Sequence, residues 1–300
     1  MNISEESFVS WSQGPAETET AKCENAEGMV RKAIEADEGL AELNISVFAQ
    51  GSYLARTNIR QDSDVDICVC CYDSFIADYP SGKKREDFGN VAATLKFSEF
   101  KDMIETALNN YFGEAGVTRG NKAFDVHANT YRIDADVVPV FEHRRYTGDT
   151  NPDGTPCFLS GVALRPDKGE LIRNWPNQNY DNGVARNNDT GRSYKRVIRI
   201  LKRLRNKMQE EKIAGTENFA SFLIECLVWN APLQAFQHET YTEIIQDVLA
   251  EVFNKTMKDE DCKEWGEVNE LKYLFRPSQP WTREQANTFL DSAWNYIGYK

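Results

Sequence analysis

Short runs of hydrophobic residues dominate the first part of the chain, and such runs are typical of β-strands. They predict strands over residues 43–50, 64–72, 123–127 and 131–141. Helices are expected over 15–37, which is rich in alanine, glutamate and lysine, and over 98–112, where apolar residues recur at helical spacing. The polar segment 73–90 predicts a loop, and the Asn-Pro-Asp-Gly sequence at 151–154 predicts a turn between strands.

The last third of the chain has the hydrophobic spacing of helices. Over residues 194–208 an apolar stripe recurs about once per helical turn; it consists of Val197, Leu201, Leu204 and Met208. Further helices are expected over 218–229, 241–253 and 282–296, the last with Thr282 as its N-cap. The residues before Pro15 predict only a short polar leader.

Strands in the first part and helices in the last predict an α+β protein. We expect a lobe built on a mixed β-sheet, packed against a C-terminal helical lobe. The first domain is placed at residues 1–185 and the second at 186–300. Residues 1–40 are expected to contain a helix that crosses to the second lobe. At 300 residues the chain is long enough for both lobes to have a core.

The composition is that of a soluble globular protein, with 41% hydrophobic and 27% charged residues. No apolar run approaches the roughly 18 residues of a membrane span, and the first residues do not resemble a secretory signal. Seven cysteines, an odd number, predict reduced thiols and a cytoplasmic location. The three histidines, His127, His143 and His238, are far apart in the sequence, which argues against a zinc site.

The net charge of −12 argues against a general nucleic-acid-binding protein, which would carry a basic surface. The charge is uneven, however, because residues 192–207 contain many lysines and arginines and no acidic residue. This predicted basic helix suggests a focused site for a polyanion such as a triphosphate. Four of its residues are expected by default on a solvated helix face: Lys195, Arg196, Arg199 and Arg203.

The segment that joins the first two predicted strands is the most informative part of the sequence. Gly51 and Ser52 follow the first strand, in a turn that offers backbone N–H groups and a hydroxyl to a phosphate. Asp64 and Asp66 open the next strand, where side chains two apart point to the same face. Two carboxylates on one face suit Mg²⁺ or Mn²⁺, which prefer oxygen ligands and keep some of their water.

A third carboxylate would complete the set that two-metal phosphoryl transfer needs. The candidates are Asp134 and Asp136, again two apart in an apolar predicted strand. An Asp-x-Asp pair alone is weak evidence, because many acidic surface strands contain one. Together with the upstream Gly-Ser turn and a third strand aspartate, it predicts a nucleotidyltransferase.

These motifs resemble those of the polymerase-β-type nucleotidyltransferase superfamily. The matching segments are Gln50-Gly51-Ser52, Asp64-Val65-Asp66 and Ala135-Asp136-Val137-Val138-Pro139. Within the superfamily the chain resembles the CD-NTases, bacterial relatives of cGAS and oligoadenylate synthase, and among these the CdnE branch. The likeness continues through Arg173-Asn174-Trp175-Pro176, Asn182-Gly183-Val184, the basic helix and Ser221-Phe222-Leu223-Ile224-Glu225.

The resemblance implies a role for each matching residue. Asp64, Asp66 and Asp136 would bind two Mg²⁺ or Mn²⁺ ions, and Asp136 would also help to activate the acceptor hydroxyl. Asp136 is preferred to Asp134 because Val-Val-Pro follows it, as in the family motif; Asp134 would be a strand-flanking acid. The nucleotide would be bound by the other matching residues: Gln50, Gly51, Ser52, Asn174, Lys202 and Ser221.

The same resemblance assigns the donor triphosphate and a nucleobase to particular residues. Gly51, Ser52, Lys202 and Ser221 would hold the triphosphate, and Gln50 is either a nucleotide contact or a strand-end amide without function. Asn174 would face a base, and the family associates asparagine there with pyrimidines and serine with purines. Three nearby residues are rivals, Asn182, Asn187 and Asn188, although Asn-Gly and Asn-Asn pairs are commonly turn residues.

The implied enzyme is a cyclic dinucleotide synthase that joins two NTPs, such as ATP and UTP, with release of pyrophosphate. Its product would contain a pyrimidine, as cyclic UMP-AMP or cyclic di-UMP does, and would signal in anti-phage defence to a separate effector protein. The alternative enzyme is a linear nucleotidyltransferase acting on RNA ends or a small molecule. A non-catalytic binding module is disfavoured because all three carboxylates are present. We expect a monomer without a nucleic-acid activator or membrane association.

Overall fold

The computed structural model describes residues 3–59 and 64–299. The chain divides into two compact units. One, which we call the sheet unit, consists of Ala16–Tyr53 and Ser63–Asn177. The other, which we call the helical unit, consists of Met1–Pro15, Leu54–Asp62 and Gln178–Lys300. The N-terminal segment therefore belongs with the C-terminal helices.

A mixed sheet forms the centre of the sheet unit, and within the described residues it has seven strands. They are β1 (Ile45–Ala49), β2 (Val65–Asp78), β3 (Val117–Arg119), β4 (Phe124–Val126), β5 (Ala135–Thr150), β6 (Pro156–Leu164) and β7 (Ile172–Asn174). The order across the sheet is β1-β2-β5-β4-β3, while β6 pairs with β5 and β7 with β6. β2 and β5 run parallel and the other pairs are antiparallel. The predicted mixed sheet is confirmed.

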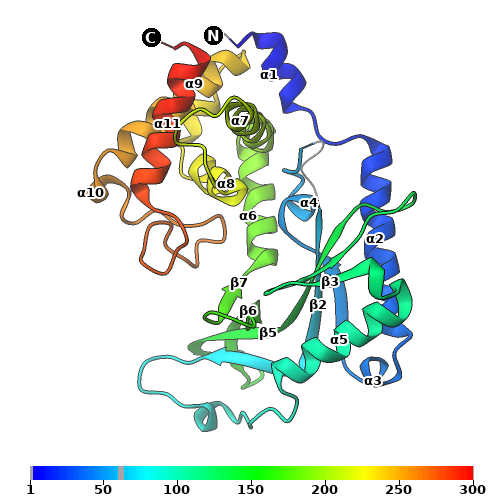
Figure 1. Cartoon of the computed structure of the whole chain (residues 1–300). Coiled ribbons are helices and arrows are strands. Elements are labelled where there is room, and N and C mark those ends of the chain that lie inside the picture. Colours follow the sequence, from blue (N-terminus) through cyan, green and yellow to red (C-terminus); the bar gives the residue numbers. More distant parts are fainter. Residues whose placement is uncertain (1–2, 60–63, 300) are drawn as a thin grey trace. The chain divides into compact units, whose positions relative to one another are not determined.

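Two helices, α2 (Glu17–Glu35) and α5 (Phe97–Phe112), pack on one face of the three central strands (Figure 1). They form one core with alternate strand residues that are at most 1% exposed: Val65 and Ile67 of β2, Ala135 and Val137 of β5, and Phe124 and Val126 of β4. Because side chains alternate along a strand, the residue between the members of each pair points to the opposite face. In all three strands that residue is an aspartate: Asp66, Asp136 and Asp125.

β2 is longer than the apolar run predicts. It continues to Asp78 after a register shift between Cys71 and Phe75. Polar residues interrupt the run at this shift, and the strand then resumes opposite β5. The prediction of a loop over 73–90 is therefore wrong for residues 73–78. The predicted turn at 151–154 is confirmed, because it closes the hairpin of β5 and β6.

The helical unit contains most of the chain's helices. Those within the described residues are α1 (Glu5–Ser12), α6 (Pro176–Asp189), α7 (Ser193–Glu210), α8 (Ser221–Trp229), α9 (Tyr241–Thr256), α10 (Asp259–Cys262) and α11 (Arg283–Ile297), with the short 3-10 helix η3 (Leu233–Phe236). The apolar stripe of α7 lies in the core, as predicted. Thr282 caps α11 and accepts a hydrogen bond from the Gln285 N–H, also as predicted. None of the described helices combines the length and the apolar character of a membrane span.

The helices α1 and α6 are absent from the sequence-based predictions. α1 replaces the expected polar leader, and its Phe8 is 0% exposed in the core. α6 contains asparagines that were expected in turns, and it runs through the domain boundary expected at residue 185. Asn182 donates a hydrogen bond to the Val268 carbonyl at 2.8 Å, and Asn187 accepts one from the Lys195 N–H at 3.2 Å. Such tertiary hydrogen bonds favour a helix where local sequence favours a turn.

Candidate active site

A row of three aspartates crosses the sheet unit on the face that α2 and α5 leave uncovered. Asp66 is the partner of Asp136 in the parallel register of β2 and β5. Asp125 is the partner of Asp136 in the antiparallel register of β4 and β5. Residues directly opposite each other on neighbouring strands have Cβ atoms about 4.5–5.5 Å apart. The three carboxylates therefore lie side by side, and we call them the acidic row.

Asp64 and Asp134 lie one step beyond the acidic row. They directly precede Val65 and Ala135, which are register partners, and the Val65 N–H donates a hydrogen bond to the Asp134 carbonyl at 3.0 Å. The Asp134 carboxylate accepts a hydrogen bond from the Ala128 N–H at 2.5 Å. Asp134 thus holds the segment that leads into β5, whereas the Asp64 side chain is exposed next to the acidic row.

Burial and charge repulsion both act on the acidic row. The pKa of Asp136 is raised, first because partial burial disfavours its charged form and then because the charges of Asp64 and Asp125 repel it. A carboxylate that is half-buried among other carboxylates is stabilised by a cation. The electrostatics of the acidic row therefore suit a positively charged ligand.

The donor set also fits a hydrated divalent ion. Within the described residues, no three acidic, cysteine or histidine side chains converge into a preformed metal cage. Mg²⁺ is seldom bound by such cages, because it keeps several waters and takes other ligands from substrate phosphates. Carboxylates on one open face of a sheet supply the oxygen ligands that Mg²⁺ and Mn²⁺ prefer.

A backbone hydrogen bond joins the Gly-Ser turn to the strand that carries Asp66. The Gln50 N–H donates a hydrogen bond to the Asp66 carbonyl at 2.8 Å. Gly51 begins the short helix α4 (Gly51–Ala55) and has a φ of +63°, and a Cβ added to it would overlap the Asp66 carboxylate. Glycine is favoured at this position, since it adopts a positive φ without strain and leaves the space beside the Asp66 carboxylate empty. Ser52 follows directly and is partly exposed.

Asn174 ends β7, where it is the partner of Val162 of β6. A Cβ at Gly161 would lie 2.5 Å from the Asn174 carbonyl oxygen and 2.8 Å from Trp175 Cδ1, so the two strands touch closely here. On either side, Arg173 pairs with Asp78 at 2.8 Å and the Trp175 ring is buried against that of His143. These contacts fix the backbone of Asn174.

In the helical unit, Lys202 belongs to a buried polar network, and Ser221 is half-buried. Lys202 is 2% exposed and donates hydrogen bonds to Glu225 Oε1 at 2.7 Å and to the Thr57 carbonyl at 3.2 Å. The Thr57 hydroxyl donates to the same Glu225 oxygen at 2.8 Å. Ser221 accepts a hydrogen bond from the Arg205 guanidinium at 3.0 Å. The roles of Glu225 and Thr57 in holding Lys202 are not evident from the sequence.

The expectation of a solvated basic face is wrong for three of the four residues concerned. Lys195 is 9% exposed, and burial lowers its pKa. Arg199 donates hydrogen bonds to the carbonyls of Ser12 and Arg56, and burial lowers its pKa to about 10. Arg203 donates to the carbonyls of residues 10, 11 and 13. Arg199 and Arg203 thus satisfy carbonyl groups at the end of α1, and Arg196 is exposed as expected.

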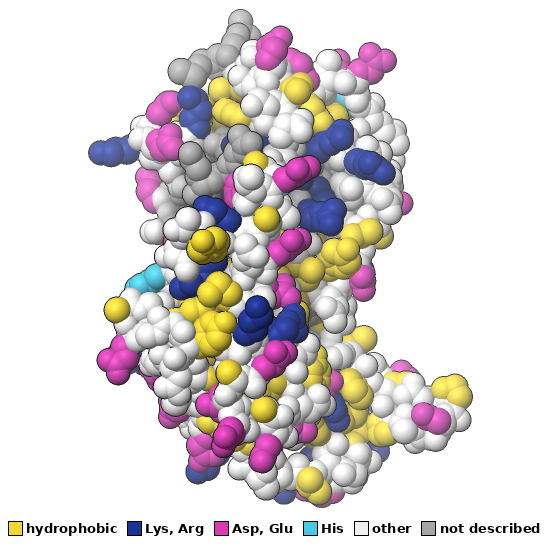
Figure 2. Space-filling view, turned by 90° about the vertical axis from the view of Figure 1, so that its right-hand side faces the viewer, with side chains coloured by type: hydrophobic (Ala, Val, Ile, Leu, Met, Phe, Trp, Pro, Cys, Tyr) yellow, Lys and Arg dark blue, Asp and Glu magenta, His cyan; other side chains and the backbone are white. Residues whose placement is uncertain are grey.

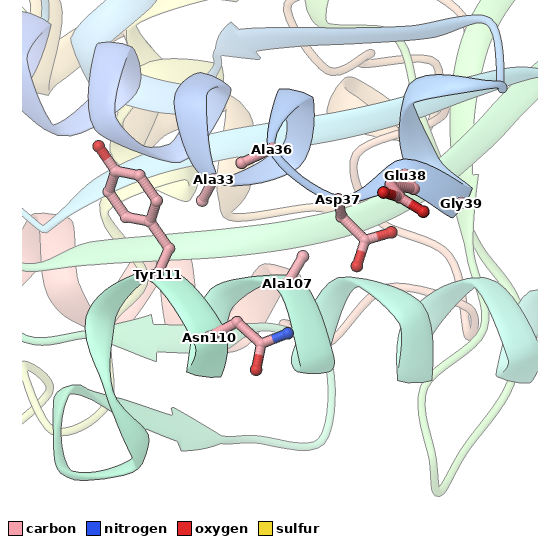
Figure 3. Close-up of a pocket in the computed structure, with 8 residues that line it drawn as sticks. All are labelled: Ala33, Ala36, Asp37, Glu38, Gly39, Ala107, Asn110 and Tyr111. Carbon is pink, nitrogen blue, oxygen red and sulfur yellow. The ribbon is translucent and has the colours of Figure 1, made fainter.

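A separate hollow of about 410 Å³ lies between α2, α5 and the short helix α3 (Glu38–Ala41). Figure 3 shows its lining, which consists of Ala33, Ala36, Asp37, Glu38, Gly39, Ala107, Asn110 and Tyr111. Asp37 already caps α3 by accepting a hydrogen bond from the Leu40 N–H. Because α2 and α5 cover the sheet face opposite the acidic row, this hollow is not part of the acidic site.

The mixed sheet, its acidic row and the Gly-Ser turn define a polymerase-β-type nucleotidyltransferase fold. Comparison with known proteins supports this class. A family model for the cGAS/DncV-like nucleotidyltransferase C-terminal helical domain matches residues 181–298. Two curated proteins named cyclic dipyrimidine nucleotide synthase CdnE are similar to nearly the whole chain. The one from Legionella pneumophila is 43% identical, over 98% of this chain and 97% of the relative, and the one from Cecembia lonarensis is 40% identical, over 98% of both.

Solved structures of two further proteins are similar to nearly the whole of this chain. The Rhodothermus marinus CdnE c-UMP-AMP synthase with Apcpp and Upnpp matches with a TM-score of 0.83 and 29% identity, covering 99% of this chain and 98% of that one. The Elizabethkingia meningoseptica CdnE cyclic dinucleotide synthase with GTP and Apcpp matches with a TM-score of 0.80 and 32% identity, covering 99% and 100%. The chain therefore belongs to the CD-NTase family and, within it, to the CdnE branch.

Proposed function

We propose that this protein is a cyclic dinucleotide synthase, which joins two NTPs and releases pyrophosphate. The observation that carries the proposal is the acidic row with its adjoining Gly-Ser turn, in a chain that is 43% identical to a CdnE synthase over nearly its full length. Phosphoryl transfer of this kind needs little covalent chemistry from the protein. It depends on positioning and on stabilising charge, which this surface can provide.

The metal centre consists of Asp64, Asp66 and Asp136, which would hold two Mg²⁺ or Mn²⁺ ions. When bound, these ions favour the ionised acceptor hydroxyl and stabilise the leaving pyrophosphate. Asp136 is next to the acceptor hydroxyl in this proposal and helps to activate it. The repulsion that raises the pKa of Asp136 is relieved when positive charge binds to the row.

Residues that would bind the donor phosphates are assigned in each unit separately. In the sheet unit, the Gly51 N–H and the Ser52 hydroxyl bind phosphate oxygens, and Gln50 contacts the nucleotide. In the helical unit, Ser221 donates its hydroxyl and Lys202 supplies positive charge. The Lys202 ammonium keeps its 2.7 Å contact with Glu225 and exchanges the longer contact with the Thr57 carbonyl, at 3.2 Å, for a phosphate oxygen.

Asn174 is proposed to select a pyrimidine. Its side-chain amide offers one donor group and one acceptor in a plane, which matches the edge of uracil, and its backbone is fixed by the contacts of β7. The products would be cyclic UMP-AMP or cyclic di-UMP, made from ATP and UTP. The names of the Legionella and Cecembia relatives and the Upnpp in the Rhodothermus structure support this assignment.

The linear alternative, transfer to RNA ends or to a small molecule, is less well supported. Basic and acidic side chains are interspersed on the face seen in Figure 2, and no broad basic tract is visible there. The net charge of −12 also opposes binding to RNA. We further propose that the product acts in anti-phage defence on a separate effector protein, and that the enzyme is a cytoplasmic monomer that needs no nucleic-acid activator.

Pyrophosphate stoichiometry tests the proposed reaction. The protein is incubated with ATP, UTP and Mg²⁺, and the released pyrophosphate is compared with the nucleotide consumed. Ring closure releases one pyrophosphate per NTP and leaves no 5′-triphosphate, and mass spectrometry of the product should show a cyclic dinucleotide. A product that keeps its 5′-triphosphate, or one that forms only when RNA is added, would contradict the proposal.

A further inference from the structure

We propose that Asp125 is a positioning residue of the metal centre and that it binds the water shell of a divalent ion held by Asp64, Asp66 and Asp136. The inference rests on the proposed function, since it requires that metal centre. It gives a role to a residue that none of the sequence motifs includes.

The position of Asp125 is fixed by the core on the other face of the sheet. Its neighbours Phe124 and Val126 are both 0% exposed beneath α2 and α5. This burial sets the strand's orientation, so Asp125 must point to the face that carries Asp66 and Asp136. The register places Asp136 between the other two acids. Asp125 is thus as close to Asp136 along the sheet as Asp66 is, on the opposite side.

A threonine and a histidine lie on the outer side of Asp125. Thr118 is its partner in the register of β3 and β4. His127 Nε2 lies 3.8 Å from the Asp125 carboxylate and 3.0 Å from the Thr118 hydroxyl oxygen. Among the described residues, no lysine or arginine forms an ion pair with Asp125. An aspartate that repels its neighbours and has no lysine or arginine partner is suited to a cation.

The water shell explains why a carboxylate at this position is useful. Mg²⁺ dehydrates reluctantly and keeps several waters, which need hydrogen-bond acceptors. The Asp125 side chain is 53% exposed, so water reaches it. Groups that bind through a metal's ligands rather than to the metal typically change metal affinity about 10- to 100-fold when they are removed. Asp125 adds such an acceptor and a further negative charge.

Metal binding without nucleotide tests the proposal by a measurement other than activity. Mn²⁺ alone is titrated into the full-length protein while its melting temperature is followed, because an ion that binds only the folded state raises it. The variants are Asp125→Asn, Asp125→Glu and, as a matched control, Asp149→Asn. Asp149 is an exposed aspartate near the far end of β5. Asp125→Ser is prepared as a second neutral variant in case Asp125→Asn does not fold.

We expect the half-saturating Mn²⁺ concentration to rise about 10-fold in Asp125→Asn or Asp125→Ser. It should return toward that of the unchanged protein in Asp125→Glu, and Asp149→Asn should have no effect. Neutral variants that bind Mn²⁺ as the unchanged protein does would overturn the role of Asp125, as would an Asp125→Glu variant as weak as Asp125→Asn. If the unchanged protein itself gains no stability from Mn²⁺, the metal centre of the proposed function fails instead.

Discussion

Gly51 and Asp66 lie so close together that a side chain on Gly51 would force the Asp66 carboxylate to move. A Cβ there would overlap the Asp66 carboxylate, and the backbone at Gly51 has a φ of +63°. The backbone hydrogen bond from Gln50 to Asp66 holds the turn and the strand in this arrangement. The Gly-Ser turn and the strand that carries Asp66, which we propose as phosphate and metal sites, are therefore one structural piece, and a change in either displaces the other.

The variant Gly51→Ala tests this relationship. We expect it to lower product formation roughly 100-fold, because displacing a catalytic group by about 1 Å has that order of effect. Gly82→Ala is the matched control: Gly82 also has a positive φ, of +79°, but no atom lies within 4 Å of its added Cβ. Both variants should lose about 1–2 kcal/mol of stability in urea unfolding because of the backbone strain. Equal activities in the two variants would show that the Asp66 contact is unimportant.

Lys202 and Glu225 form a buried ion pair. We expect that removing one of the two charges destabilises the protein far more than replacing both. Glu225→Gln leaves an uncompensated charge on Lys202, which is 2% exposed, and should lower the free energy of unfolding by about 3–5 kcal/mol. The double variant Lys202→Met with Glu225→Leu should recover most of this loss but remain inactive. Breaking the exposed pair of Arg85 and Glu86 with Glu86→Gln should leave the stability almost unchanged, because solvent screens this pair.

These stabilities are measured by urea unfolding of all four proteins, alongside product formation. An active double variant would remove Lys202 from the triphosphate site. A double variant as unstable as Glu225→Gln would show that the loss comes from packing rather than from an unpaired charge.

His143 should make the protein less stable in mild acid. It is 0% exposed, its Nδ1 donates a hydrogen bond to the Ile76 carbonyl at 2.8 Å, and burial lowers its pKa below 6.5. The unfolded chain therefore binds the proton more readily than the folded one, and stability is lost as the pH falls below about 6.5. We expect the free energy of unfolding to decrease less between pH 7.5 and 5.5 in His143→Gln. A pH profile of His143→Gln identical to that of the unchanged protein would assign the effect to other groups.

Asn174→Ser should shift base preference toward purines. Serine cannot present the paired donor and acceptor of an amide, and one lost hydrogen bond corresponds to about a tenfold change in selectivity. The measurement compares kcat/KM for UTP and GTP in competition. Asn188→Ser, at an exposed position of α6, is the control and should leave the preference unchanged. An unchanged preference in Asn174→Ser would remove Asn174 from the base pocket.

Much of the fold could be predicted because local pattern and tertiary packing agree. The stripe of α7, the cap of α11 and the apolar first part of β2 are set by residues close in sequence, and all are found where expected. α6 could not be predicted, since its asparagines favour turns locally and are held in a helix by Val268 and the Lys195 backbone. The last residues of β2 could not be predicted, because polar residues interrupt its apolar run at the register shift.

Only some residues of the candidate site could be predicted from the sequence. Asp64, Asp66 and Asp136 stand in motifs, but Asp125 joins them only through the register of β4 and β5. The Phe-Asp-Val alternation of β4 indicated an outward-facing aspartate, yet it did not show which strand lies beside it. Burial of Lys195 and Arg199 could not be foreseen either, because their partners are backbone carbonyls and rings rather than acidic side chains.

The most direct test of the account uses NTPs labelled at the α-phosphate. The protein is incubated with labelled ATP and UTP and Mg²⁺, and the products are then treated with phosphatase. We expect label that resists phosphatase, because a cyclic product has no terminal phosphate. The Asp64→Asn, Asp66→Asn double variant should fold, as shown by circular dichroism, but form none of it. Label that stays fully sensitive to phosphatase, or resistant label made by the double variant, would contradict the account.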